Sequence, residues 1–140
     1  MVKGIYTART FTTTDFGRQS SAKMQAAGIA QGCPLSPYLF IIVMSVLLAD
    51  VAKRLGEERV THNMRPYIAT EDLLYADDTM LAASDAETLQ LHVDLLVREG
   101  QAYGLELNVS KTVLLQIGSN VTLHGPGGIP IKNVSQTVYL

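Results

Sequence analysis

Hydrophobic residues concentrate in one long segment, from Tyr38 to Ala49, which contains a single serine. The segment is shorter than the roughly 20 residues that span a bilayer, so it predicts a buried helix. Pro37 suits the first turn of that helix, and Gly56 is expected to end it. An alternative interpretation treats the segment as an interfacial or membrane helix of an unrelated protein.

Threonine-rich segments with a strand-like pattern precede this helix. Residues 8–14 and 20–26 flank the tetrapeptide Asp15-Phe16-Gly17-Arg18, whose composition is typical of a hairpin turn. These residues predict a β-hairpin that leads into Gly28.

Two short hydrophobic segments, at residues 73–75 and 80–83, lie on either side of the acidic pair Asp77-Asp78. This pattern predicts a strand, a tight turn and a second strand, with both carboxylates at the tip. Residues 84–87, Ser-Asp-Ala-Glu, then have the form of a capping box, and apolar residues follow at helical spacing. A helix of about four to five turns is expected here, and Gly104 is expected to end it.

The remaining residues predict short strands. Residues 105–109 and 112–117 have strand-like patterns, and the Gly-Pro-Gly-Gly sequence at 125–128 separates residues 121–123 from 129–131, which predicts a final hairpin. Strands that alternate with helices predict a mixed α/β or α+β fold, in which sheet packs against helices.

Composition narrows the functional classes. The 140 residues suffice for one domain with a core, and 47% hydrophobic against 17% charged residues exclude intrinsic disorder. The net charge of −2 argues against the broad positive surface of a free-standing nucleic-acid binder. The single cysteine, Cys33, excludes an internal disulfide and is interpreted as a small apolar filler in a reducing compartment. The three histidines are scattered and predict no zinc site.

The acidic pair is the first candidate for chemistry. Two adjacent carboxylates repel one another unless a cation or a proton compensates their charge. Mg²⁺ fits such a pair because it prefers hard oxygen ligands and is usually held by one or two carboxylates together with substrate phosphates. The alternative is a solvated turn, since aspartate is common in turns. By themselves, Asp77 and Asp78 leave both interpretations open.

Four motifs, in order, resemble those of reverse transcriptases. Tyr75-Ala76-Asp77-Asp78, after two leucines, resembles the YxDD box in the LLYADD form of non-LTR retrotransposons and group II intron proteins. Residues 28–40, G-I-A-Q-G-C-P-L-S-P-Y-L-F, are similar to the box G-x-x-Q-G-x-P-L-S-P-x-L-F. Residues 104–112 are similar to G-L-x-L-N-x-x-K-T, and residues 137–140 to the start of a segment with Y-L-G. The resemblance covers essentially the whole chain, and the wording LLYADDTML favours the non-LTR retrotransposon type.

This resemblance implies a polymerase palm, an α+β fold with an antiparallel sheet packed against helices. It also implies an RNA-directed DNA polymerase, a nucleotidyltransferase in which a primer 3′-hydroxyl attacks the α-phosphate of a dNTP with the help of two metal ions about 4 Å apart. Mg²⁺ is the expected cofactor, and Mn²⁺ can replace it. The expected partners are an RNA template, a DNA primer and dNTPs, and no membrane is expected.

The resemblance also assigns catalytic roles. Asp77 is expected to be the direct metal ligand, and Asp78 to add negative charge with a weaker or indirect contact to the metal. Lys111 matches a lysine proposed to protonate or neutralise the departing pyrophosphate, a role that a flexible point charge can fill. The alternative for Lys111 is a solvated lysine in a turn.

Three further residues are expected to contact nucleic acid or dNTP. Tyr75 is expected near the primer terminus, or alternatively in the core, where strand aromatics are common. Gln31 and Gly32 are expected along the template and the nascent base pair, because an amide both donates and accepts hydrogen bonds and glycine permits close backbone approach. Taken alone, Gln31 also fits an exposed loop.

The sequence departs from the family at one point. The family has a third carboxylate in a D-x-x-x-A-F-D segment before the box that begins at Gly28, and no such segment is present. Asp15 is the only acidic residue before Gly28, and it lies in the predicted hairpin turn. Residues 1–140 are therefore expected to form a partial palm domain, without fingers, first catalytic strand and thumb, that is inactive alone. The alternative is a catalytically dead retroelement remnant that acts, if at all, as a nucleic-acid or protein binding module.

Overall fold

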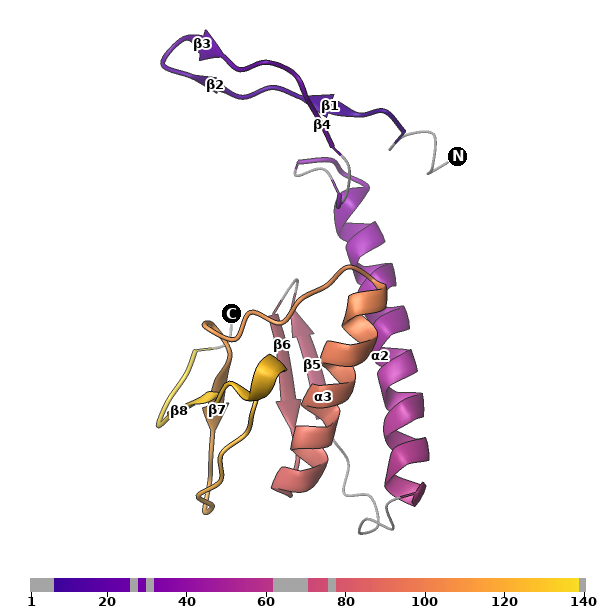
Figure 1. Cartoon of the computed structure of the whole chain (residues 1–140), viewed down its shortest axis with the longest axis vertical. Helices are drawn as coiled ribbons and strands as arrows, with labels where there is room; N and C mark the ends of the chain where they lie inside the picture. The colour runs from indigo at the N-terminus through magenta and orange to yellow at the C-terminus, as the bar shows by residue number, and fades with distance from the viewer. Residues whose placement is uncertain (1–6, 26–27, 30–31, 62–70, 76–77, 139–140) are drawn as a thin grey trace. The chain divides into compact units, whose positions relative to one another are not determined.

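The computed structural model is drawn in Figure 1, and the helices and longer strands belong to the second of its two compact units. The units are Met1–Ser36 and Pro37–Leu140. The residues described are 7–25, 28–29, 32–61, 71–75 and 78–138, with residues 59–61 and 71–75 described by their backbone alone.

The first unit contains a β-hairpin made of two consecutive strand pairs. In this hairpin β1 (Thr10–Phe11) pairs with β4 (Lys23–Met24), and β2 (Thr14–Asp15) pairs with β3 (Arg18–Gln19), both antiparallel. The two residues between β2 and β3 have φ values of +46° and +75°, the positive values that a type I′ turn requires. The predicted hairpin is confirmed, and its turn lies inside the predicted tetrapeptide.

The long hydrophobic segment forms α2 (Ser36–Thr61), whose 26 residues continue past Gly56. The expectation that Gly56 ends this helix is wrong. Leu55 is buried in the core on one side of Gly56, and Glu58 on the other side forms a 2.8 Å ion pair with Arg98 of the next helix. These contacts hold the helix together through a residue that lowers helix propensity by about 1 kcal/mol.

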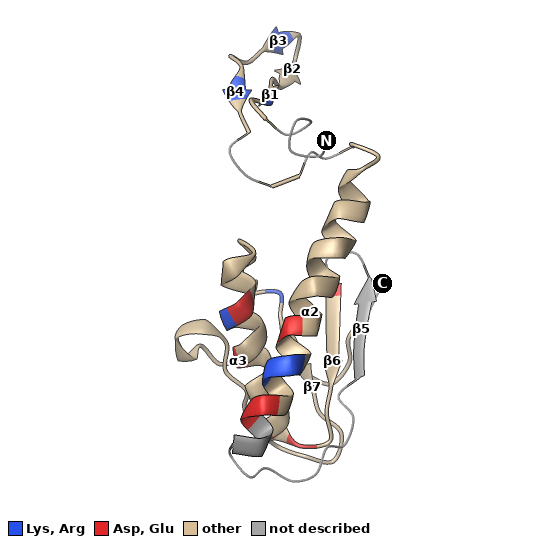
Figure 2. Ribbon diagram, turned by 90° about the vertical axis from the view of Figure 1, so that its right-hand side faces the viewer, with Lys and Arg blue, Asp and Glu red and all other residues tan. Residues whose placement is uncertain are grey.

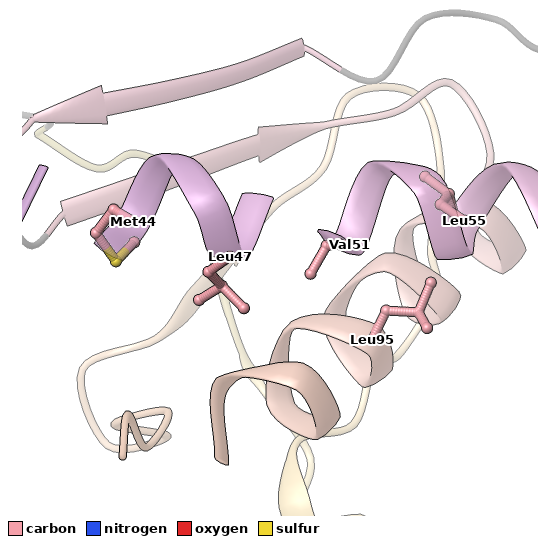
Figure 3. Close-up of a cluster of buried hydrophobic side chains, with 5 residues drawn as sticks. All are labelled: Met44, Leu47, Val51, Leu55 and Leu95. Carbon is pink, nitrogen blue, oxygen red and sulfur yellow. The ribbon is translucent and has the colours of Figure 1, made fainter. Parts of the chain in front are cut away.

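Only one face of α2 is buried, so the prediction of a buried helix holds for that face alone. Its buried side chains recur at helical spacing and are Met44, Leu47, Val51 and Leu55 (Figure 3). Large hydrophobic side chains on the other side of the helix are exposed, namely Tyr38, Ile41, Ile42 and Val46. Among the described residues, no helix has both the length and the hydrophobicity to cross a membrane.

The two strands predicted on either side of the acidic pair are confirmed, and the predicted turn between them, at residues 76–77, lies outside the described residues. The two strands, β5 (Glu71–Tyr75) and β6 (Asp78–Ala82), pair antiparallel over their full lengths. Asp77, which the prediction places at the tip, lies outside the described residues.

The predicted second helix is α3 (Ala86–Ala102). Asp85 is its N-cap, and the Asp85 carboxylate accepts a hydrogen bond from the backbone N–H of Thr88 at 2.7 Å. The cap thus lies one residue later than in the predicted capping box. Gly104 follows the C-cap residue Tyr103 with a φ of +70°, so the predicted end of the helix is confirmed.

The two helices share the first hydrophobic core. Leu95 of α3 is 1% exposed and packs with the buried face of α2 (Figure 3). Acidic and basic residues lie on both α2 and α3 (Figure 2). Among them, Arg98 of α3 pairs with Glu58 near the end of α2 at 2.8 Å and with Glu99 at 3.2 Å. Arg54 lies 3.9 Å from Glu99 as well. Apolar contacts and ion pairs therefore join α2 to α3.

A second core lies between α3 and the C-terminal segments. Its buried members are Val93, Leu114, Leu123 and Ile131. Leu81 of β6 and Leu89 of α3 pack against this cluster. The second core therefore ties the β5–β6 hairpin to the C-terminal strands.

The predictions for the C-terminal segments are partly wrong. Residues 105–109 form no strand, and residues 112–117 contribute only β7 (Val113–Leu115). The chain reverses at the 3₁₀ turn η1 (Pro126–Gly128), where Ile131 N–H donates to the Leu123 carbonyl at 2.8 Å, as a hairpin requires. The following strand, β8 (Lys132–Val134), pairs with β7 in parallel.

One side chain supports this parallel pairing. The Gln116 amide nitrogen donates to the carbonyl of Val121 and, at 2.8 Å, to Oδ1 of Asn133, while its amide oxygen accepts from the Val121 N–H at 3.0 Å. Gln116 therefore fastens the segment after β7 to β8. Helices and mainly antiparallel strand pairs together form the predicted α+β, palm-type fold.

Candidate functional site

The β5–β6 hairpin carries the candidate metal ligands. Its backbone register runs from Glu71 opposite Ala82 to Tyr75 opposite Asp78. Tyr75 and Asp78 are thus the last residue of β5 and the first residue of β6, and only residues 76–77 lie between them in the sequence. The structure brings these two predicted site residues into direct opposition.

Burial differs between the two ends of β6. Leu81 is half-buried against the second core, whereas Asp78 and Thr79 are exposed. The N-cap of α3, Asp85, follows β6 after two residues, so the capped helix holds the far end of the strand. Because the core contact is at Leu81, the acidic residue is left at the solvent-exposed end.

The metal-binding chemistry of this hairpin follows from its oxygen ligands. Carboxylate oxygens are hard donors of the kind that Mg²⁺ and Mn²⁺ prefer, so Asp78 and its sequence neighbour Asp77 fit either ion. Among the described residues, no group of three histidine, cysteine, aspartate or glutamate side chains is placed to hold a metal. Asp77 lies outside those residues, so its geometry stays a prediction.

A compact turn presents Lys111 on the surface. The carbonyl oxygen of Asn108 accepts hydrogen bonds from the N–H of Lys111 at 3.1 Å and from the N–H of Thr112 at 3.0 Å. The Thr112 hydroxyl donates to the same oxygen at 2.9 Å, and the Ser110 hydroxyl donates to the Asn108 side chain at 2.7 Å. Lys111 itself is exposed.

The role of Asn108 in this turn was not predicted from the sequence. Asparagine followed by serine and threonine within four residues is a signal for side-chain-stabilised turns, and it could have identified the residue. The structure shows Asn108 as the acceptor on which the turn is organised.

Gly32 lies in the first unit, just before α2. Its φ is +78°, and a Cβ added there would meet no atom within 4 Å. Backbone conformation rather than crowding therefore accounts for glycine at this position. Ser36 N–H then donates to the Cys33 carbonyl at 3.0 Å as α2 begins. Gln31 lies outside the described residues.

The chain matches a known protein family over most of its length. No solved structure matches the chain. Residues 2–137 match the protein family described as "Reverse transcriptase (RNA-dependent DNA polymerase)". The match spans nearly the whole chain and includes both the Gly28 box and the β5–β6 hairpin. The chain therefore belongs to the reverse transcriptase family of RNA-dependent DNA polymerases.

Proposed function

We propose that residues 1–140 form part of the palm of a retroelement reverse transcriptase, with the β5–β6 hairpin as its catalytic element. The single observation that carries this proposal is the closing pair of that hairpin, Tyr75 opposite Asp78. This register puts the acidic residue at an exposed strand end, which suits a carboxylate that must meet a metal ion and a nucleotide phosphate together.

Asp77 and Asp78 are the residues proposed to hold the ion. When bound, Mg²⁺ stabilises the attacking and leaving oxygens of the phosphoryl transfer. Asp77 acts as the direct ligand, and Asp78 adds negative charge beside it. The carboxylate oxygens of both residues also suit Mn²⁺.

The remaining site residues position the nucleic acid and the leaving group. Tyr75 faces the primer terminus, and Gln31 with Gly32 lies along the template and the nascent base pair. Lys111 neutralises or protonates the departing pyrophosphate. The exposed position of Lys111 and the hydrogen-bonded turn that presents it support this role.

The substrates follow from the family. We infer that the complete enzyme copies an RNA template from a DNA primer with dNTPs. The LLYADDTML wording and the thirteen-residue box at 28–40 support a non-LTR retrotransposon or group II intron type, with the former preferred.

Direct metal binding tests this proposal without requiring polymerisation. Mn²⁺ added to the 140-residue chain is expected to increase the relaxation rates of nuclei near the β5–β6 hairpin and so to broaden their NMR signals. Asp77→Asn and Asp78→Asn are both expected to weaken this effect. Glu106→Gln, which removes an exposed acidic charge from the loop after α3, serves as the control and is expected to leave it unchanged. Equal Mn²⁺ effects in all variants would contradict the proposal.

Primer extension distinguishes the active enzyme from the alternative of a dead remnant. In a polymerase that contains this segment, Asp77→Asn is expected to abolish DNA synthesis on an RNA template. A remnant that serves only as a binding module predicts no synthesis in either form, together with unchanged nucleic-acid or protein binding.

A further inference from the structure

Charge is divided unequally between the two compact units. Residues 1–36 contain four of the eleven basic residues and one of the thirteen acidic residues. The first unit therefore has a formal charge of +3, and the second unit has −5. The chain's net charge of −2 is therefore the sum of a basic first unit and an acidic second unit. The negative total does not argue against nucleic-acid binding by the first unit.

Two basic residues of the first unit, Arg18 and Lys23, lie on strands of the β1–β4 hairpin. Arg18 opens β3 and Lys23 opens β4, and both are exposed (Figure 2). Asp15 is the only acidic residue of the hairpin, at the end of β2. A shallow, open depression on this hairpin is lined by Thr13, Asp15, Phe16, Arg18, Gln19 and Ser20.

The tip of the hairpin carries an aromatic ring in an unusual position. Phe16 is 99% exposed and has a φ of +46°. A large hydrophobic side chain in water and a bulky residue in the left-handed region are each unfavourable, and glycine or asparagine would suit this turn position better. Neither the fold of the hairpin nor solubility accounts for phenylalanine here.

The hairpin is held together by its own hydrogen bonds. Ser20 N–H donates to the Thr13 carbonyl at 2.9 Å, and Thr13 N–H donates to the Ser20 hydroxyl at 3.0 Å. The Gln19 amide donates to the Thr12 hydroxyl at 3.0 Å. These bonds stabilise the hairpin that carries both the exposed ring and the two exposed cations.

From these observations we propose that the β1–β4 hairpin binds single-stranded nucleic acid, with Phe16 stacking on a base and Arg18 and Lys23 contacting the backbone phosphates. Exposed aromatic residues combined with cations are the general means of binding unpaired strands, because every base offers a stacking face. A duplex buries these faces, so it lacks the partner for Phe16. The inference deepens the proposed function, since a template copied by the palm is a single strand.

The test measures binding of the whole chain to a fluorescein-labelled single-stranded RNA by anisotropy, in EDTA. A single-stranded DNA of the same sequence shows whether the hairpin distinguishes the two sugars, and a duplex serves as the comparison. EDTA removes any contribution of the proposed metal site. If the chain does not bind single strands in EDTA, the proposed metal site at β5–β6 is unaffected. If Mn²⁺ does not bind at β5–β6, the proposed nucleic-acid contact of the β1–β4 hairpin is likewise unaffected.

The ring is tested by Phe16→Asn. Asparagine followed by Gly17 is the preferred sequence for a type I′ turn, so this variant keeps or strengthens the hairpin while it removes the ring. Affinity for the single strand is expected to fall about 5- to 150-fold, the range for loss of one base stack. Phe16→Trp is expected to retain binding. Unchanged affinity of Phe16→Asn would overturn the stacking contact.

The cations are tested by the double variant Arg18→Gln with Lys23→Gln. Loss of two phosphate contacts is expected to weaken binding and to reduce the slope of log affinity against log salt by about 1.4, or roughly 0.7 per contact on a single strand. The matched control, Lys53→Gln with Lys132→Gln, removes the same charge from exposed positions of the second unit and is expected to have little effect. Asp15→Asn is expected to tighten binding. Equal weakening by both double variants, or tighter binding of the duplex, would overturn the proposal.

Discussion

The hydroxyl of Tyr103 donates a hydrogen bond of 2.5 Å to Oδ2 of Asp50, joining the residue that caps α3 to the middle of α2. The contact lies where the polypeptide leaves α3 for the loop that contains Asn108. It therefore links the packing of the two helices to the point from which the Lys111 turn departs.

Because of the Tyr103–Asp50 hydrogen bond, the free energy of unfolding is expected to fall at alkaline pH. The bond to Asp50 is the main cause that raises the pKa of the Tyr103 phenol above its ordinary value of about 10. The folded state thus favours the protonated phenol. Its stabilising contribution is present in full below pH 10 and is lost as the pH rises through the raised pKa.

Tyr103→Phe is expected to lower the free energy of unfolding at pH 8, and the difference from the wild type is expected to shrink above pH 10. Urea denaturation at both pH values measures it. Tyr38→Phe removes a hydroxyl from a tyrosine that is 67% exposed on α2 and serves as the control. A difference that stays constant with pH would contradict the assignment.

Arg98→Gln removes a cation that pairs with Glu58 and Glu99. Because these side chains are partly exposed, the expected loss is modest, about 0.2–1 kcal/mol at low ionic strength. The loss is expected to diminish in 1 M salt, where charges are screened within about 3 Å. Chemical denaturation at both salt concentrations measures it, with Lys53→Gln as the control. A loss that is insensitive to salt would show that Arg98 acts by packing instead.

Leu95→Ala tests the core that joins the helices. Leu95 is 1% exposed among the buried side chains of α2, so its truncation is expected to cost about 2–5 kcal/mol. Ile117→Ala, at a side chain that is 91% exposed, is expected to change the free energy of unfolding by less than about 0.5 kcal/mol. Equal effects of the two substitutions would mean that α2 and α3 do not share a core.

Two glycines give a matched pair of substitutions with opposite signs. Gly104→Ala places a side chain at a φ of +70° and is expected to cost about 1–2 kcal/mol. Gly56→Ala lies inside α2 and is expected to stabilise the protein by about 0.5–1 kcal/mol. A new Cβ meets no atom within 4 Å at either position, so crowding contributes to neither result. Thermal unfolding of both variants measures the difference in sign.

The same two glycines show how far local sequence determines this fold. Both were expected to end a helix, and only Gly104 does so, because Gly56 is flanked by the buried Leu55 and by Glu58, which pairs with a residue forty positions away. Tertiary contacts of this kind cannot be derived from propensity. The parallel pairing of β7 and β8 escaped prediction for the same reason, since the amide of Gln116 that supports it reaches Asn133.

The spacing of apolar residues was sufficient to predict the pair of strands that carries the candidate metal ligands. Apolar segments on both sides of two acids predicted the β5–β6 hairpin, and the structure places Asp78 at its end. The turn that presents Lys111 depends on Asn108, whose side chain and carbonyl accept several hydrogen bonds at once. A sequence motif identifies the residues of such a turn, but it does not predict which of them accepts the hydrogen bonds that stabilise it.

The uncovered side of α2 has a consequence for handling the purified chain. Tyr38, Ile41, Ile42 and Val46 form a water-exposed hydrophobic stripe outside both cores, and such stripes promote self-association at high concentration. Concentrated samples are therefore expected to sediment as more than one species. Ile41→Glu with Ile42→Glu is expected to reduce this self-association without loss of the fold, because neither isoleucine belongs to a core formed by the described residues.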